Sequence, residues 1–318
     1  MKIGVLTSGG DAPGMNAALR AVVRRAISMG RQVFGIRRGY EGLLEGEICP
    51  MDVSSVADII HRGGTILHTA RSERFKQLES LDLAASRLKA AGLDSLIVIG
   101  GEGSFKGMAA LADRGIRTIG VPATIDNDIA CTDYSIGFDT AVNTGLEAVN
   151  RLRDTATSHE RIFVVETMGR HTGHLALAVG LAGGAESILI PEQPVRISEI
   201  CGRLKRGIAR GKVHSIIVVA EGASDGFEVA QEVERCMGSE IRVTVLGHVQ
   251  RGGTPTAFDR ILASRLGAGA VDAICQGNSR ALAGISGQKV VITSIDKVLA
   301  EAKALDLGVY SLAEDLAK

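Results

Sequence analysis

Residues 122–129, PATIDNDI, place two carboxylates, Asp126 and Asp128, two positions apart. Pro122 follows an apolar run and disfavours a helical conformation for the residue before it, so a strand is expected to end here. In an extended segment, residues two apart point the same way, so the carboxylates would share one small volume, flanked by Thr124 and Asn127. Like charges this close repel unless a metal, a cation or a shared proton lies between them. The pattern indicates either a catalytic or metal-binding pair or a surface Asx turn.

Three glycine-rich segments follow β-branched runs: TSGGDAPGMNAA at 7–18, VIGGEGSF at 98–105 and VETMGRHTGH at 165–174. Each is expected to join a strand to a helix, which aims backbone N–H groups and the positive end of the helix dipole at one point. Glycines in these loops would let a phosphate approach the backbone closely. No GxxxxGK[ST] segment occurs, and Lys106 stands where the dinucleotide fingerprint needs its last glycine. The loops therefore predict a phosphate site that is neither a P-loop nor a dinucleotide fingerprint.

Basic residues follow or begin other predicted strands. VLGHVQRGGTP carries His248 and Arg251, and Arg242 and Arg161 each begin a strand-like run. A phosphate monoester binds two or three such donors, and arginine binds it through a planar fork. An arginine taken alone is more often a solvated surface residue than part of an anion site. Glu221, in AEG at a strand end, fits either a sugar-hydroxyl acceptor or a helix-capping acid.

The first predicted helix carries Arg20 and Arg24 four positions apart. Like charges at this spacing destabilise a helix by a few tenths of a kcal/mol, about 0.2–0.5, and a bound anion would relieve the repulsion. Arg210, Lys212 and His214 form a second basic row that fits an anion site or an ordinary solvated loop.

Composition excludes several classes of function. The chain has 318 residues, 45% of them hydrophobic, with 36 basic and 36 acidic residues, so no global field attracts nucleic acid or an anionic membrane. No stretch approaches the roughly 20 apolar residues of a membrane span, and the N-terminal apolar run is too short for a signal peptide. Three tyrosines and no tryptophan offer little surface for stacking bases. The five cysteines are scattered singly, which predicts a reducing cytoplasm with no disulfide framework and no zinc site.

Short apolar runs alternate with segments of helical spacing along the whole chain. Strands are expected at 2–6, 33–36, 95–99, 118–121, 162–166, 188–190, 215–220, 243–246, 283–285 and 289–293. This alternation predicts an α/β fold with parallel sheets covered by helices on both faces. Ligands then bind at the carboxyl ends of the strands. No low-complexity linker occurs, and the polar stretch 154–161 is the one candidate for a weak domain boundary.

The motifs GGDAPGMNAA, GGEGS, TIDNDI with TDYSIGFDTA, MGR, AEG and GHVQRGGTP together resemble the bacterial, short-chain ATP-dependent 6-phosphofructokinases in order and spacing. The resemblance covers nearly the whole chain. It implies two similar three-layer αβα lobes with mainly parallel sheets: residues 1–137 with 251–304 for the nucleotide, and 138–250 with 305–318 for the sugar phosphate. It also implies a glycolytic, cytoplasmic homotetramer that transfers the γ-phosphate of ATP to the 1-hydroxyl of fructose 6-phosphate, giving fructose 1,6-bisphosphate and ADP.

The resemblance also assigns roles to residues. Asp126 matches the general base, Asp128 and Glu102 match the carboxylates that hold Mg²⁺, and Arg71 matches the group that stabilises the transition state. Around the nucleotide and the transferred phosphate it implies Gly10, Tyr40, Arg71, Ser72, Gly101, Glu102, Gly103, Ser104 and Thr124, with Tyr40 near the adenine. For fructose 6-phosphate it implies Thr124, Asp126, Asp128, Met168, Gly169, Arg170, Glu221, His248 and Arg251, with Arg161 and Arg242 reaching the 6-phosphate from a neighbouring subunit.

The family's effector site, for ADP or phosphoenolpyruvate, would comprise Arg20, Arg24, Arg153, Glu186, Arg210, Lys212 and His214. Val53 and Val213 stand where relatives carry basic residues, which should weaken an anion site.

Other departures bear on the phosphate donor. Glu102 replaces an aspartate, Ser72 replaces a frequent aromatic, and Ala123 replaces the glycine of PGTIDND. Pyrophosphate-using relatives have a lysine at the position of Ala123 and an acid after GGD. Ala123 carries no charge and Gly103 leaves room, so ATP is the expected donor. A pyrophosphate-dependent phosphofructokinase and a non-catalytic sugar-phosphate-binding regulator are the alternative interpretations.

Overall fold

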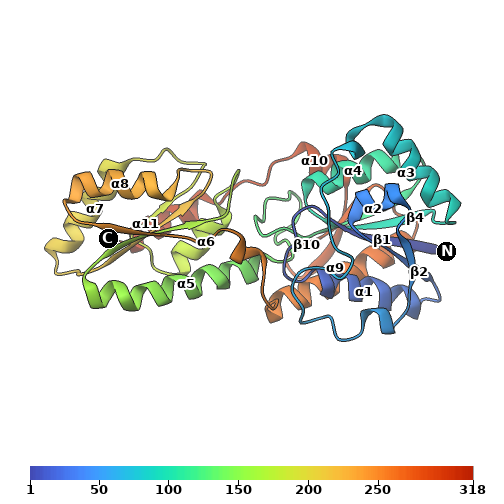
Figure 1. Cartoon of the computed structure of the whole chain (residues 1–318), viewed down its shortest axis with the longest axis horizontal. Helices are drawn as coiled ribbons and strands as arrows, with labels where there is room; N and C mark the ends of the chain where they lie inside the picture. Colours follow the sequence, from blue (N-terminus) through green and yellow to red (C-terminus); the bar gives the residue numbers. More distant parts are fainter. Residues whose placement is uncertain (318) are drawn as a thin grey trace. The chain divides into compact units, whose positions relative to one another are not determined.

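The computed structural model describes residues 1–317 and has the predicted α/β class, with sheets built mainly from parallel strands. The chain forms two compact units (Figure 1). Unit 1 comprises Met1–Thr140 and Arg251–Lys303, and unit 2 comprises Ala141–Gln250 and the segment from Ala304 onward. The weak boundary expected at 154–161 is wrong, because helix α5 (Phe138–His159) continues through most of that stretch. The assignment of the units to nucleotide and sugar phosphate remains a prediction.

Unit 1 contains a seven-stranded sheet in the order β11-β10-β5-β4-β1-β2-β3. Its strands are β1 (Lys2–Ser8), β2 (Gln32–Ile36), β3 (Ile48–Met51), β4 (Ser95–Gly100), β5 (Arg117–Pro122), β10 (Ala281–Ser286) and β11 (Lys289–Ser294). The five inner strands are parallel, and the edge strands β3 and β11 are antiparallel. Strand β3 was not predicted, because it is four residues long and contains Pro50, which a sheet tolerates at its edge.

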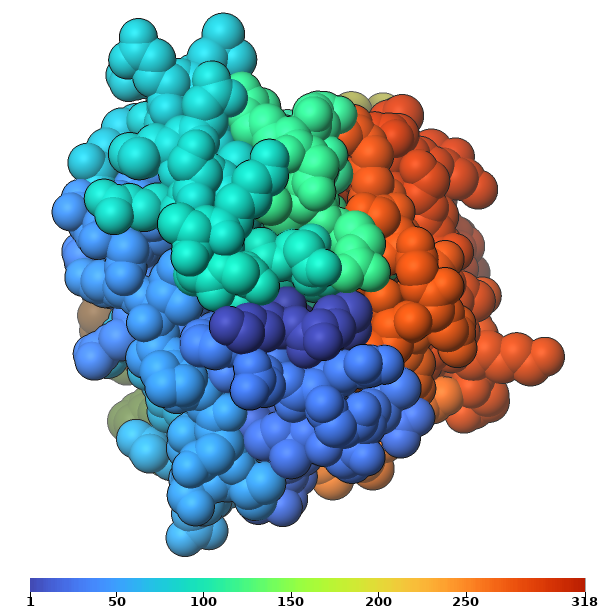
Figure 2. All heavy atoms as spheres, turned by 90° about the vertical axis from the view of Figure 1, so that its right-hand side faces the viewer, coloured from blue at the N-terminus to red at the C-terminus, as the bar shows by residue number. Residues whose placement is uncertain are grey.

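Helices cover both faces of this sheet (Figure 1). They are α1 (Met15–Ser28) and α9 (Ala257–Cys275) on one face, and α2 (Gly39–Glu45), α3 (Leu78–Ala90), α4 (Glu102–Ala112) and α10 (Ile295–Ala300) on the other. In α1 the apolar side chains of Leu19, Val22 and Ala26 are fully buried. Gly267 lets α9 approach α1 closely, since a Cβ there would lie 2.7 Å from the Ala18 carbonyl oxygen. Figure 2 shows residues 251–303 (orange) packed beside the N-terminal residues (dark blue).

Asp259, on α9, is fully buried and anchors the start of α5. Its carboxylate accepts hydrogen bonds from the Gly137 N–H at 2.9 Å, the Thr140 N–H at 2.8 Å and the Thr140 hydroxyl at 2.5 Å. Burial raises the pKa of Asp259, and the bonds from Thr140 and Gly137 act in the opposite direction. The carboxylate thereby fixes the chain that follows the PATIDNDI segment.

Unit 2 contains a four-stranded parallel sheet in the order β7-β8-β6-β9. Its strands are β6 (Ile162–Thr167), β7 (Ser187–Leu189), β8 (Ser215–Ala220) and β9 (Ile241–Val245), and its helices besides α5 are α6 (His174–Ala182), α7 (Ile197–Ala209), α8 (Gly226–Met237) and α11 (Leu307–Leu316). The predicted strands of both units are confirmed, with ends that shift by at most two residues. Within the described residues, no helix is both long enough and apolar enough to cross a membrane.

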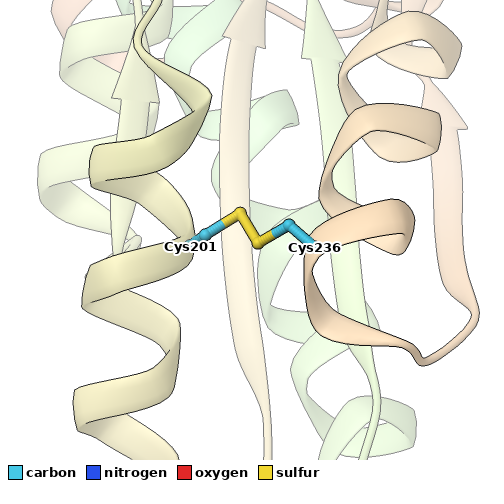
Figure 3. Close-up of a disulfide and its surroundings, with 2 residues drawn as sticks. All are labelled: Cys201 and Cys236. Atoms are coloured by element: carbon cyan, nitrogen blue, oxygen red, sulfur yellow. A yellow bond between two sulfur atoms is a disulfide. The ribbon is translucent and has the colours of Figure 1, made fainter.

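Cys201 on α7 and Cys236 on α8 form a disulfide (Figure 3). The expectation of no disulfide is therefore wrong. The two cysteines are 35 residues apart in the sequence, and only the packing of α7 against α8 brings them together. Cys49, Cys131 and Cys275 are free, and the scattered spacing of the five cysteines no longer argues for a reducing compartment.

We expect unfolded, non-reduced protein to show three thiols to a thiol reagent, and five after reduction. Closing a loop of this length stabilises a domain by about 3–4 kcal/mol in the chain-entropy model, so reduction should also lower the unfolding midpoint. A variant with alanine at both Cys201 and Cys236 is the control, since its midpoint should not respond to reductant. Five reactive thiols before reduction would contradict the bond.

Replacing Asp259 with asparagine turns one of its two acceptor oxygens into an NH₂ group, which cannot accept the bonds that Gly137 and Thr140 donate. Leaving such buried donors unsatisfied should lower the free energy of unfolding by about 2–4 kcal/mol. Asp272→Asn on the same helix is the matched control, because Asp272 is partly exposed and pairs with Arg25 at 2.7 Å. That change should cost less than about 1 kcal/mol. Denaturant unfolding measures both, and equal effects would show that the buried carboxylate has no special role.

Candidate active site

A cavity of about 650 Å³ lies in unit 1 at the carboxyl ends of β1, β4 and β5. We call it the unit 1 cavity. All the residues predicted to surround the nucleotide line it: Gly10, Tyr40, Arg71, Ser72, Gly101, Glu102, Gly103, Ser104 and Thr124. Asp126, Asp128, Ala123 and Arg251 line it too. The sequence positions are far apart, and the parallel sheet brings them to one edge.

The DND turn, residues 126–128, follows β5 and presents its carboxylates as the spacing predicted. Thr124, Asp126 and Asp128 line the cavity, whereas the intervening Ile125 and Asn127 are buried. Asn127 has a φ of 50° and is 5% exposed, so the buried amide sits at the bend of the turn. The alternation puts both carboxylates in one volume, and the surface-turn interpretation does not describe this geometry.

The first two glycine loops line the side of the cavity where a phosphate is predicted to bind. A Cβ at Gly100 would lie 2.4 Å from the Ser8 carbonyl oxygen, so glycine lets the ends of β4 and β1 meet. A Cβ at Gly10 would lie 2.4 Å from an Arg251 guanidinium nitrogen, so that cation packs directly on the loop. No atom lies within 4 Å of a Cβ built at Gly103, which leaves open space at the N-terminus of α4. The free N–H groups of that helix end suit an anion.

Glu102 begins α4 and forms an ion pair with Lys106, with a carboxylate oxygen 2.5 Å from the ammonium nitrogen. Among residues 1–317, no group of three or more His, Cys, Asp or Glu is placed to hold a metal ion. Mg²⁺ usually takes one or two protein carboxylates and completes its shell with substrate phosphates and water. Glu102 and Asp128, on one cavity with two phosphate loops, fit that pattern.

The other end of the cavity is apolar and aromatic. Tyr40 stacks on Phe75, with ring centroids 4.1 Å apart, and its hydroxyl donates to the Ser104 carbonyl oxygen at 2.5 Å. Burial raises the pKa of Tyr40 far above its ordinary value, so the hydroxyl stays protonated. The sequence interpretation noted the missing aromatic at Ser72 but overlooked Phe75, the single aromatic between residues 70 and 80. This end suits a flat, apolar ring.

A buried side chain, Asn16, holds residues 62–66, which precede Arg71 in the chain. The Asn16 amide donates to the carbonyl oxygens of Arg62 and Gly63, both at 3.1 Å, and its oxygen accepts from the Ile66 N–H at 2.8 Å. Asn16 is 1% exposed. It lies within the first glycine motif, and the sequence alone did not separate its role from that of the glycines.

In unit 2, several predicted sugar-phosphate residues gather at the carboxyl edge of the sheet. Met168, Gly169 and Arg170 follow β6, Glu221 follows β8, and His248 lies after β9 in a 3-10 helix (Gly247–Arg251). The Met168 N–H donates to the fully buried Gln250 amide at 2.8 Å. Arg170, Glu221 and His248 are exposed. Gln250 supports this edge and was not identified from the sequence.

Arg161 and Arg242 lie at the opposite, amino edge of the same sheet. Arg161 precedes β6, and Arg242 is the second residue of β9, in register with Phe163. Strand β6 has six residues and rises about 3.3 Å per residue, so its two ends lie roughly 17 Å apart. Arg161 and Arg242 therefore lie at the edge of the sheet opposite to His248.

Unit 2 has a cavity of about 450 Å³ lined by Glu186, Arg210 and Lys212, all predicted effector residues. Lys212 forms an ion pair with the buried Glu186. The imidazole of His214 lies 3.3 Å from the Thr157 hydroxyl, and burial lowers the pKa of His214. Of the other predicted effector residues, Arg153 donates to the Gly183 carbonyl oxygen, and Arg20 and Arg24 lie on α1 in unit 1.

The sequence model of the family described as phosphofructokinase matches residues 2–274. A protein of Halalkalibacterium halodurans named ATP-dependent 6-phosphofructokinase is 56% identical over 315 residues, or 99% of this chain and 99% of the relative. One of Natranaerobius thermophilus with the same name is also 56% identical, and one of Clostridium botulinum is 53% identical, each over 99% of both chains.

Solved structures of phosphofructokinases also match this chain. Phosphofructokinase from Saccharomyces cerevisiae matches with a TM-score of 0.90 and 37% identity over 99% of this chain, which spans about half, 48%, of the yeast chain. A structure named pyrophosphate-dependent phosphofructokinase from Marinobacter aquaeolei matches with a TM-score of 0.83 and 26% identity, over 97% of this chain and 86% of that one. With a family match over most of its length and relatives more than half identical from end to end, this chain belongs to the phosphofructokinase family.

Proposed function

We propose that this chain is a glycolytic ATP-dependent 6-phosphofructokinase, which transfers the γ-phosphate of ATP to the 1-hydroxyl of fructose 6-phosphate. One observation carries the proposal: a single cavity holds Asp126, Asp128 and Glu102 together with both glycine loops. These are the groups that phosphoryl transfer requires, namely a base, metal-binding carboxylates and phosphate-binding N–H groups. The names of the most similar relatives support the same reaction.

In this mechanism Asp126 is the general base. It takes the proton of the sugar 1-hydroxyl as the oxygen bonds to the γ-phosphorus, and the bond from that phosphorus to the ADP oxygen breaks. Arg71, Thr124 and the N–H groups near Gly10 and Gly103 stabilise the charge on the transferred group. Their positions are set by the fold before substrate binds, and positioning with charge stabilisation supplies most of the rate in such reactions.

We propose that Glu102 and Asp128 hold Mg²⁺, whose charge would offset that of the ATP phosphates. Metal binding would have to compete with Lys106 for Glu102, since the two side chains form an ion pair.

For the sugar phosphate we propose Met168, Gly169, Arg170, Glu221 and His248 of unit 2, with Thr124, Asp126, Asp128 and Arg251 of unit 1. Arg161 and Arg242 would bind the 6-phosphate held by another copy of the chain, because they lie at the amino edge of the sheet. This separation supports the proposed homotetramer. We also propose a cytoplasmic location, since the reaction consumes ATP and a sugar phosphate.

ADP or phosphoenolpyruvate would bind as an effector to Arg20, Arg24, Arg153, Glu186, Arg210, Lys212 and His214. Arg210 and Lys212 line the unit 2 cavity beside Glu186, and these two basic side chains support the proposal. Val53 and Val213 are 42% and 46% exposed and offer no charge, so binding should be weak.

The aromatic end of the unit 1 cavity favours ATP over pyrophosphate as the donor. Tyr40 and Phe75 form a stacked pair beside the glycine loops. The adenine base of ATP could pack against this pair, whereas pyrophosphate has no base. Ala123 lines the cavity and carries no charge. The pyrophosphate-using relatives have a lysine at this position.

Purified protein with fructose 6-phosphate, ATP and Mg²⁺ should produce ADP and fructose 1,6-bisphosphate, and chelation of the metal should abolish the reaction. Pyrophosphate in place of ATP should give no product, because neither Ala123 nor Gly103 supplies the groups typical of pyrophosphate users. Turnover with pyrophosphate alone would overturn the donor assignment. Absence of turnover with either donor would favour the non-catalytic regulator.

Replacing Asp126 with serine should leave substrate binding largely intact and lower kcat by at least about 10²-fold, the lower end of what a general base contributes. Asp82→Ser is a suitable control, because Asp82 is exposed on α3, pairs with Arg114 and does not line the unit 1 cavity. Steady-state kinetics with both substrates measures the effect. Near-normal turnover of the Asp126 variant would refute its role as base.

A further inference from the structure

Lys303, the last residue of unit 1, reaches back to the DND turn from the segment that follows α10. Its ammonium donates to the Asn127 side-chain oxygen at 3.0 Å and to the Asp133 carbonyl oxygen at 2.8 Å. The motifs that identify the family end well before this residue. Its contacts nevertheless fall on the residue between the two carboxylates of the site.

The bonds around Asn127 form a closed ring. The Asn127 oxygen also accepts from the Ser135 N–H at 2.9 Å, and its amide nitrogen lies 3.4 Å from the Asp133 carbonyl oxygen. Lys303 therefore adds a second donor to both acceptors of the ring. Asn127 has a left-handed backbone, a conformation that persists only where the surroundings hold it. The ring is that support.

Lys303 is costly to keep as a charged group. Burial lowers its pKa to about 8 from the ordinary 10.5, while Asp133 and Asp128 act in the opposite direction. At pH 7, below this pKa, the side chain is charged and its desolvation penalty is fully present; the penalty fades as the pH rises from about 8 toward 10.5. A methionine would fill similar space without that penalty, so what the ammonium contributes is its hydrogen bonds.

We propose that Lys303 is a positioning residue of the phosphoryl-transfer site, which locks Asn127 and thereby fixes the direction of Asp126 and Asp128. The proposal rests on the proposed function, in which these carboxylates are the base and a metal ligand. Displacements of about 1 Å in such a site can cost 10²-fold in rate, so loss of the lock should appear in turnover rather than in binding.

Lys303→Met tests this directly. We expect kcat to fall about 10- to 100-fold, with the KM values for ATP and fructose 6-phosphate unchanged. The unfolding midpoint should stay the same or rise, because a desolvated charge is removed. Lys297→Met is the matched control: Lys297 is 59% exposed on α10, lies 3.9 Å from Glu301 and does not line the unit 1 cavity. It should behave as the unchanged protein.

A double variant separates a lock on Asn127 from an independent effect. If Lys303 acts through Asn127, Lys303→Met combined with Asn127→Ala should be no slower than Asn127→Ala alone. If the two substitutions instead lowered kcat independently, so that their fold-changes multiplied in the double variant, that result would overturn the proposal. So would a Lys303→Met enzyme with unchanged kcat, or one in which kcat, KM and unfolding midpoint all worsen together, which indicates general damage.

Hydrogen exchange gives a readout that does not need turnover. The Ser135 amide should exchange faster in Lys303→Met, and unchanged exchange would contradict the lock even if the protein were inactive. Should the methionine variant fail to fold, Lys303→Ala, which also removes the donor, is measured in its place. It should show faster exchange of the Ser135 amide and a lower kcat, and wild-type values for both would overturn the proposal. An unmodified protein without kinase activity would refute the proposed function while leaving the exchange test valid.

Discussion

Asp126 and Asp128 face one cavity, and the repulsion between their carboxylates is the constraint on which the rest of the site depends. Positive groups surround them: Arg71 and Arg251 line the same cavity, the N-terminus of α4 opens into it, and Lys303 lies behind the turn. The proposed Mg²⁺ and the phosphates of ATP would complete this balance of charge. Without such partners the pair would be costly, and with them it can divide the work of proton transfer and metal binding.

The parallel sheet supplies the geometry for this balance. Because β1, β4 and β5 run in the same direction, their carboxyl ends deliver two glycine loops and the DND turn to one edge. Close approach is needed there, and Gly100 permits it against the Ser8 carbonyl oxygen. In unit 2 the same principle gathers Arg170 and His248 at a carboxyl edge while leaving Arg242 at the other. The edge on which a residue lies thus decides which partners it can have within one copy of the chain.

The strands and most residues of the unit 1 cavity could be predicted from the sequence, because they depend on short local patterns. Runs of β-branched residues predict the strands. The spacing of Asp126 and Asp128 predicts that their side chains point the same way, and in the structure both line the unit 1 cavity. What was missed depends on packing between distant segments. The Cys201–Cys236 bond requires α7 beside α8, and Phe75 gains its role by stacking on Tyr40. Nothing in the sequence distinguishes Lys303 from the other lysines, because its contact with the DND turn depends on the fold. The edge strand β3 has only four residues, too few for a recognisable pattern.

The central claim is that a carboxylate at position 126 accepts the sugar proton during transfer from ATP. The pH dependence of the single-turnover rate, measured with saturating ATP, Mg²⁺ and fructose 6-phosphate, tests it most directly. The rate should fall about tenfold per pH unit on the acidic side, below the pKa of the base, and that limb should be absent from the residual rate of the Asp126→Ser variant. A rate that stays constant from about pH 6 down to about pH 3, a range that spans the usual pKa of an aspartate, would contradict the account, provided the protein remains folded.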